Sequence, residues 1–131
     1  MHQIIYTSTA RPGLSQEEVF RIVEQSARNN PSHDITGFLL FRKGKFLQLV
    51  EGPLMALETL LAQLGQDDRH SELTVISRLP IAGRSFPRWR MRRVGGDRDA
   101  LDELEQALRG EGSGLPIPEV VRNFVRETVD A

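Results

Sequence analysis

Two side chains with polar groups in strand-like segments are the best candidates for chemistry in this sequence. Gln48 lies in the middle of an apolar run from Phe46 to Val50. Burying a primary amide without hydrogen-bond partners costs about 1–3 kcal/mol on mutational scales, so Gln48 is expected to have a polar partner. Tyr6, the only tyrosine, alternates with Ile4 on a predicted strand, and its hydroxyl needs a partner when buried. A simpler interpretation stays open for both, as core side chains bonded to backbone or to buried water.

Two further pairs of side chains stand at the ends of predicted elements. Asn30 falls on the apolar stripe of a predicted helix, so its amide either caps the helix end or points into the gap between helix and sheet. Asn29 can do either. Trp89 and Met91 alternate along the last predicted strand, where core filling is the simple interpretation. Met is also a soft, adaptable side chain that can move aside for another group.

Composition excludes several other chemistries. The 131-residue chain has no cysteine, which rules out disulfides, thiolate zinc sites and cysteine nucleophiles. His33 and His70 have no metal-ligand spacing, and no phosphate-binding glycine loop or nucleophile–base set is found. The formal net charge of −1, from 17 basic and 18 acidic side chains, gives no electrostatic reason to expect nucleic acid or an anionic membrane as partner.

The positioning elements can be predicted from residue patterns. Ser15 and Glu18 have the spacing of a capping box at a helix start. The predicted order is strand 2–9, helix 15–30, strand 35–41, strand 45–50, helix 54–64, strand 73–79 and strand 89–94. This βαββαββ order predicts an α+β, ferredoxin-like sheet with two helices on one face. First and third strands are commonly neighbours in this fold, so we expect Tyr6 and Gln48 to meet.

A second unit is predicted beyond the sheet. Gly95-Gly96 ends the first unit, residues 1–95, and residues 96–131 form a helical extension. Two amphipathic helices are expected there, at 99–108 and 118–129, and each is too short to be stable alone. They are therefore expected to pack across the bare face of the sheet or against a second subunit.

These residues together resemble the BLUF family, the sensors of blue light using FAD. The resemblance runs over residues 2–94 and combines Tyr6, the Asn29-Asn30 pair, a Phe-Leu-Gln-x-x-Glu-Gly motif and a Trp-x-Met motif in this order. Any one of these features alone would be weak. The matching segments are Ile4–Ser8, Ser26–Asn30, Asp34–Gly37, Phe46–Gly52, Asp67–His70 and Phe86–Met91.

The resemblance implies a flavin cofactor, FAD, with FMN or riboflavin as alternatives. It places the isoalloxazine ring between the two helices, beneath the sheet. The implied flavin-binding residues are Tyr6, Ile22, Arg28, Asn29, Asn30, Ile35, Lys45, Gln48, Asp67 and His70, and the implied photoactive residues are Tyr6, Gln48, Trp89 and Met91. Gln63 stands where the family often carries an arginine near the cofactor phosphates.

The resemblance also implies a mechanism. Blue light drives electron and proton transfer from Tyr6 to the flavin, and the Gln48 amide is left rotated or tautomerised. Met91 or Trp89 beside the glutamine would shift the last strand, and the C-terminal helices would read that shift. We expect a non-enzymatic, cytoplasmic sensor without a signal peptide or membrane span, which signals through a partner protein or a homo-oligomer, dimeric or larger.

Two other functions compete with this interpretation. The first is a small acylphosphatase-like enzyme on the same fold, in which Arg11 and Asn30 would bind the acyl phosphate. Such an enzyme would be colourless, whereas a flavin-loaded protein is yellow. The second is an interaction module without cofactor, such as an RNA-binding sheet. The lack of a net positive charge and the single Tyr and Trp argue against RNA.

Overall fold

The computed structural model describes residues 1–10, 13, 15, 17–18, 21, 35–42, 44–65, 70–86, 89, 92–95, 99–110 and 117–129. Five strands and three helices are described. The strands are β1 (His2–Ala10), β2 (Thr36–Arg42), β3 (Lys45–Gly52), β4 (His70–Pro80) and β5 (Arg92–Gly95). The helices are α2 (Leu54–Gly65), α3 (Asp99–Gly110) and α4 (Glu119–Val129).

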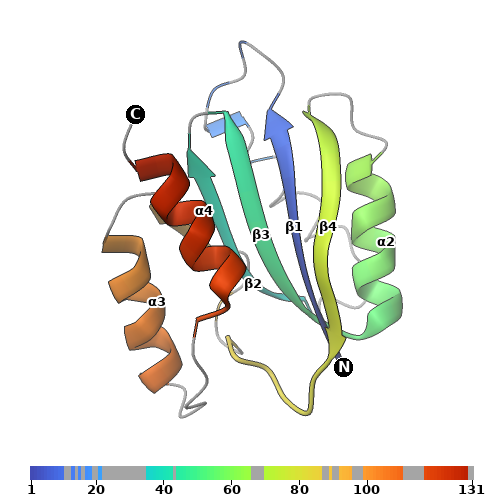
Figure 1. Ribbon diagram of the computed structural model, residues 1–131. Helices are drawn as coiled ribbons and strands as arrows, with labels where there is room; N and C mark the ends of the chain where they lie inside the picture. The colour runs from blue at the N-terminus through green and yellow to red at the C-terminus, as the bar shows by residue number, and fades with distance from the viewer. Residues whose placement is uncertain are drawn as a thin grey trace.

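The strands form one sheet in the order β4-β1-β3-β2-β5 (Figure 1). β1 pairs antiparallel with both β3 and β4, and β2 pairs antiparallel with β3. β5 joins the outer edge of β2 in parallel. The two central strands are therefore the first and third in the chain, as the ferredoxin-like prediction requires, and the fold class is confirmed.

Each face of the sheet carries its own apolar core. α2 covers one face, where its Leu57 and Leu60 join a cluster built on β1, β2 and β3. The members of that cluster are Ile4, Tyr6, Ile35, Leu39, Phe46, Val50, Ala56, Leu57 and Leu60. Alternation along the strands sends the intervening residues to the opposite face, where the buried cluster is Ile5, Phe38, Leu40, Leu47, Leu49, Phe86, Val94, Leu104, Ile117, Val121, Phe124 and Val125.

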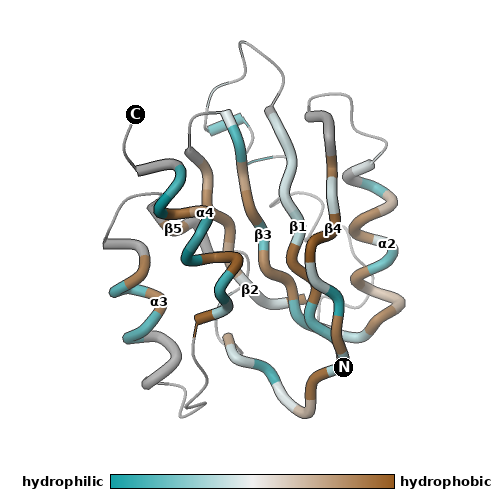
Figure 2. The backbone as a smooth tube through the Cα atoms, in the orientation of Figure 1, coloured by the Kyte–Doolittle hydropathy of each residue, from teal (hydrophilic) through white to brown (hydrophobic). Residues whose placement is uncertain are grey.

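The C-terminal helices pack on the face opposite α2. Leu104 of α3 and Val121 of α4 are fully buried in the second cluster. Figure 2 shows alternating brown and teal segments along both helices, as expected of helices with one apolar side. Arg122 of α4 also bonds Glu105 of α3 across 3.0 Å. Of the two packing arrangements expected from the sequence, the structure has the one on the bare sheet face.

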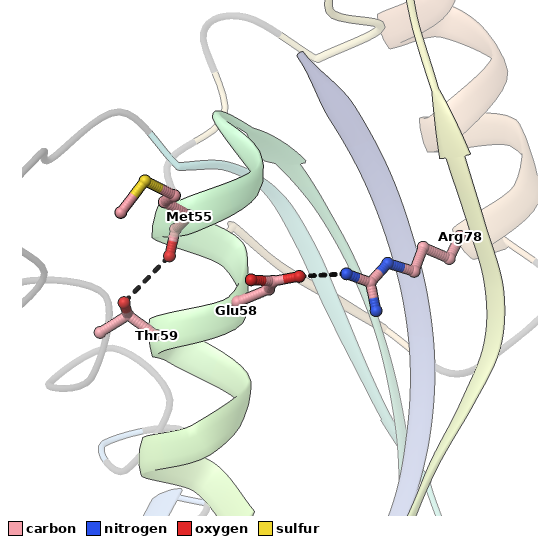
Figure 3. Close-up of polar contacts among 4 residues, drawn as sticks. All are labelled: Met55, Glu58, Thr59 and Arg78. Carbon is pink, nitrogen blue, oxygen red and sulfur yellow. Dashed lines mark hydrogen bonds and ion pairs between the residues drawn. The ribbon is translucent and has the colours of Figure 1, made fainter.

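α2 is tied to the sheet edge by a surface ion pair. Glu58 of α2 pairs with Arg78 of β4 (Figure 3). Both side chains are about half exposed, so the pair contributes at most about 1 kcal/mol. Within α2, the Thr59 hydroxyl donates a hydrogen bond to the Met55 backbone carbonyl, one turn earlier, at 2.9 Å. Burial of Leu57 and Leu60 therefore holds α2 in place more strongly than its polar contacts do.

The first predicted helix, at 15–30, lies largely outside the described residues. Its start is described, because Glu17, Glu18 and Arg21 are helical. The Ser15 hydroxyl oxygen accepts a hydrogen bond from the Glu18 backbone N–H at 3.1 Å and also bonds the Glu18 carboxyl at 3.1 Å. Ser15 is thus the N-cap that the capping-box spacing predicted.

The last strand differs from its prediction. β5 begins at Arg92, three residues after the predicted start at Trp89. Trp89 is held beside β2 by one backbone bond, from the Gly37 N–H to the Trp89 carbonyl at 2.7 Å. The predicted strand is therefore present, but it starts later than the alternation of Trp89 and Met91 indicated.

Gly37 is required by the close approach of β2 and β3. Its φ angle is 145°, a backbone conformation that residues with a side chain rarely adopt. A Cβ atom added here would lie 1.8 Å from the Leu49 carbonyl oxygen of β3. Gly44, in the turn between these two strands, also has positive φ, at 77°, but nothing lies within 4 Å of an added Cβ.

This contrast gives a matched pair of substitutions. We expect Gly44→Ala to lower the free energy of unfolding by about 1 kcal/mol, the usual penalty of a left-handed conformation. Gly37→Ala adds a backbone collision, and we expect it to cost more than about 3 kcal/mol, in the upper range of single substitutions. Urea unfolding curves measure both. Equal losses in the two variants would show that the Leu49 carbonyl does not constrain position 37.

Candidate functional site

Tyr6 and Gln48 face each other across the two central strands. They are register partners in the antiparallel pairing of β1 with β3. Both side chains are fully buried. On β3, Gln48 alternates with Phe46 and Val50, so it lies on the face that α2 covers. The predicted meeting of these residues is thus present in the strand register.

The surroundings of this pair are apolar. Leu39 is the register partner of Gln48 on the other side, from β2. Ile35, predicted as an apolar wall, is buried in the same cluster as Tyr6 just before β2 begins. Leu57 and Leu60 approach from α2. In such surroundings a polar interaction is stronger than in water, and an unsatisfied polar group costs more.

Two hydroxyl groups on this face fit a polar ligand. The Tyr6 phenol oxygen and the Ser8 hydroxyl oxygen are buried, and neither has a hydrogen-bond partner among the described residues. Burial also raises the pKa of the Tyr6 phenol well above its usual range, because the charged phenolate would lose its hydration. An orphaned buried hydroxyl is rare and costs about 1–3 kcal/mol. A ring with hydrogen-bonding edges, such as that of a flavin, would fit these hydroxyl groups.

Trp89 or Met91 was expected beside Gln48, and the structure corrects this for Trp89, which lies on the other face of the sheet. Its ring packs 5.2 Å from that of Phe86 and 6.3 Å from that of Phe38, in the cluster beneath α3 and α4. The physical reason is that Trp89 precedes β5, so strand alternation does not set its direction.

Lys45 is also not brought together with the Tyr6–Gln48 pair. It is exposed at the first position of β3. Alternation puts it on the face of Leu47 and Leu49, opposite Tyr6. The position of Lys45 therefore gives no support to the expected contact with cofactor phosphates. Its two-residue spacing from Leu47 could have predicted that it lies on the face opposite Gln48.

The other predicted site residues cannot be placed. Six of them lie outside the described residues: Ile22, Arg28, Asn29, Asn30, Asp67 and Met91. Arg11 of the competing enzyme hypothesis also lies outside them. His70 starts β4 as the register partner of Ala10, and its side chain is not described.

Glu51 is a buried polar residue to which the sequence analysis gave no role. Its carboxyl oxygens accept hydrogen bonds from the backbone N–H groups of Ser85, at 2.9 and 3.0 Å, and Phe86, at 2.8 Å. Gln3 adds a longer bond of 3.4 Å. Arg84 donates to the Glu51 backbone carbonyl at 2.9 Å and to the Thr36 hydroxyl at 2.8 Å. The feature of the sequence that could have indicated this role is the position of Glu51 directly after the apolar run from Phe46 to Val50.

Two other kinds of site are not found in the described part of the chain. No group of three or more His, Cys, Asp or Glu residues is arranged there to hold a metal ion. Among the described helices, none has both the length and the apolar character needed to cross a membrane.

Comparison with known proteins identifies the family. The sequence profile of BLUF, "Sensors of blue-light using FAD", matches residues 1–92. A solved structure described as "BlrB - a BLUF protein, dark state structure" superposes with a TM-score of 0.68 at 30% identity, covering 96% of each chain. A structure of Klebsiella pneumoniae BlrP1 superposes with a TM-score of 0.76 at 27% identity, covering 96% of this chain and 34% of the other.

Sequence relatives include much longer proteins. The photoactivated adenylate cyclase subunit beta of Euglena longa is 33% identical over 84 residues, which is 64% of this chain and 10% of the relative. The chain thus spans about a tenth of the length of this curated relative.

The raised pKa of Tyr6 predicts alkaline behaviour. An unfolded tyrosine ionises near pH 10, whereas folded Tyr6 keeps its proton to higher pH. The unfolded state then binds fewer protons, so this contribution to stability is complete below about pH 10 and is lost as the pH rises further, through the folded pKa. Because Tyr6 is the only tyrosine, phenolate absorbance reports it alone.

We expect phenolate absorbance to appear together with unfolding, followed by circular dichroism, during an alkaline titration. The Tyr6→Phe protein is the control, since it removes the phenolate signal and leaves that of any other titrating group. Ionisation near pH 10 in protein that is still folded would contradict the buried position of the Tyr6 phenol.

Proposed function

We propose that this chain, which belongs to the BLUF family of sensors of blue light using FAD, converts light into a hydrogen-bond change at Tyr6 and Gln48. The observation that carries the proposal is the register pairing of these two buried residues across the central strands. Family membership makes FAD the cofactor. The orphaned hydroxyls of Tyr6 and Ser8 supply groups that fit its ring edge.

Residues of β1, β3, α2 and the position just before β2 would hold the flavin ring. Tyr6, Ile35 and Gln48 are the described members of the proposed site, and Leu57 and Leu60 close it with apolar surface. The members proposed from the family resemblance alone are Ile22, Arg28, Asn29, Asn30, Asp67 and His70. When bound, the flavin would supply absorption of blue light and the ability to accept an electron.

The protein's own part is to hold and redirect protons at two atoms. The Tyr6 phenol keeps its proton in the dark, because burial disfavours the phenolate. It is also an electron donor whose proton becomes acidic when an electron leaves. The Gln48 amide has a donor end and an acceptor end, so reversing it exchanges the hydrogen-bond donor and acceptor that it presents. The buried setting keeps water from offering substitute hydrogen bonds.

The output is proposed to run through the C-terminal helices. We divide the chain into a sensor unit, 1–95, and a helical extension, 96–131, in which α3 and α4 pack on the face opposite α2. The extension would pass the signal to a partner protein or a homo-oligomer, dimeric or larger, in the cytoplasm, with Met91 as a second photoactive residue. The chain itself would act without an enzymatic step.

The first test is the visible spectrum of the purified protein in the dark, under blue light and after dark recovery. We expect a flavin spectrum that moves slightly to the red and returns. A protein that stays colourless after incubation with FAD would refute the proposed function and favour the enzyme or cofactor-free alternatives.

Two substitutions test the assigned residues. Tyr6→Phe should bind flavin and lose the light-induced red shift, because it removes the phenolic proton and the best electron donor. Gln48→Ala should bind flavin and lose the shift because it removes the reversible amide. Gln3→Ala is the matched control, since Gln3 is a buried glutamine on the opposite face, and it should shift normally. A normal red shift in either site variant would remove that residue from the mechanism.

A further inference from the structure

Glu51 joins the strand of Gln48 to a segment that lies beneath the C-terminal helices. Both residues belong to β3, three positions apart, so they point to opposite faces of the sheet. Gln48 points to the α2 face. The Glu51 carboxyl group is fully buried and accepts the backbone N–H bonds of Ser85 and Phe86, 34 and 35 residues further along the chain.

The segment held by Glu51 is part of the core on that face. Phe86 is buried, and its ring lies 5.1 Å from Phe38 in an edge-on arrangement. The Trp89 ring packs 5.2 Å from Phe86, and the Trp89 backbone N–H bonds the Phe86 carbonyl at 3.3 Å. Leu104 of α3 and Val121 of α4 belong to the same cluster. The position of Ser85 and Phe86 therefore sets where Trp89 packs against the cluster to which these helical residues belong.

Holding a segment by a buried carboxyl group costs free energy, because the group loses its hydration. Apolar packing of similar volume would often stabilise the fold as well or better. What the carboxyl group adds is a fixed position, because its two oxygens have to meet two particular N–H groups. Arg84 reinforces the same junction by bonding the Glu51 carbonyl and the Thr36 hydroxyl of β2.

We propose that Glu51 is a positioning residue which carries the light-induced change from β3 to Trp89 and the C-terminal helices. The proposal rests on the proposed function, because Gln48 has to be the place where the change begins. A shift of β3 then moves Ser85 and Phe86 with it. Phe86 passes the displacement to Trp89 through ring contact and one backbone bond, on the face away from the flavin.

The experiment uses the full-length, flavin-loaded protein labelled with 5-fluorotryptophan. Trp89 is the only tryptophan, so its single fluorine resonance reports this cluster alone. The flavin red shift is recorded on the same samples as an independent measure of the light reaction. We expect the wild-type resonance to move under blue light and to return in the dark together with the flavin spectrum.

Glu51→Gln is the test variant. Its amide offers one acceptor oxygen and an NH2 group that opposes the Ser85 and Phe86 donors. We expect the flavin red shift to persist and the light-dependent movement of the Trp89 resonance to be lost. Glu58→Gln is the matched control, since Glu58 lies on α2 and pairs with Arg78, away from this junction. It should keep both responses.

The outcomes separate the two proposals. Absence of the red shift in wild-type protein would refute the proposed function. A wild-type red shift with an unmoved Trp89 resonance, or a Glu51→Gln protein in which both responses match the wild type, would overturn the role of Glu51 alone.

Amide hydrogen exchange in wild-type protein covers the case in which Glu51→Gln does not fold. We expect the exchange rates of the Ser85 and Phe86 amides to change under light, because their acceptor moves. Unchanged rates at both amides, beside a normal red shift, would overturn the role of Glu51.

Discussion

The antiparallel pairing of β1 with β3 at the centre of the sheet positions every group argued to carry the chemistry. It sets Tyr6 against Gln48 and sends both to the face under α2. A slip of one residue in β3 would turn Gln48 to the opposite face and place Leu47 or Leu49 against Tyr6. Gly37 fixes the other side of β3, because only a residue without a Cβ lets β2 approach the Leu49 carbonyl. Register is therefore enforced from both neighbouring strands.

Strand alternation then assigns neighbouring residues of β3 to opposite faces of the sheet, each with its own core. Even-numbered positions of β3 contribute to the apolar cluster around Tyr6, and odd-numbered positions contribute to the core beneath α3 and α4. The two faces share only the backbone of the strands. A signal that starts at Gln48 has to cross through that backbone or through groups anchored to it. Glu51 is such an anchor, because its side chain binds a distant segment while its backbone belongs to β3.

The sequence predicted what local patterns and fold topology determine. The ferredoxin-like order and the two amphipathic helices follow from periodicity, and the Tyr6–Gln48 pairing follows from the first and third strands being neighbours in that fold. The choice of the sheet face over a second subunit as the packing surface of the helices comes from the structure alone. The face on which Trp89 lies was not predicted, because Trp89 precedes β5 and the alternation of side chains within a strand does not apply to it. The role of Glu51 was out of reach for a different reason. Its partners are backbone N–H groups, which any residue type supplies, and they lie in a distant segment whose approach no residue pattern encodes.

Tyr6 and Glu51 show two ways in which this core accommodates buried polar atoms. The Glu51 carboxyl group is satisfied within the chain, so it adds rigidity and specifies one arrangement of the Ser85–Phe86 turn. The Tyr6 hydroxyl is left for a partner that the described residues do not supply. A satisfied group resists change, whereas a group whose bond depends on a ligand changes when that ligand changes. A sensor needs both kinds, one to respond and one to hold the responding strand to its output, and β1 and β3 carry them side by side.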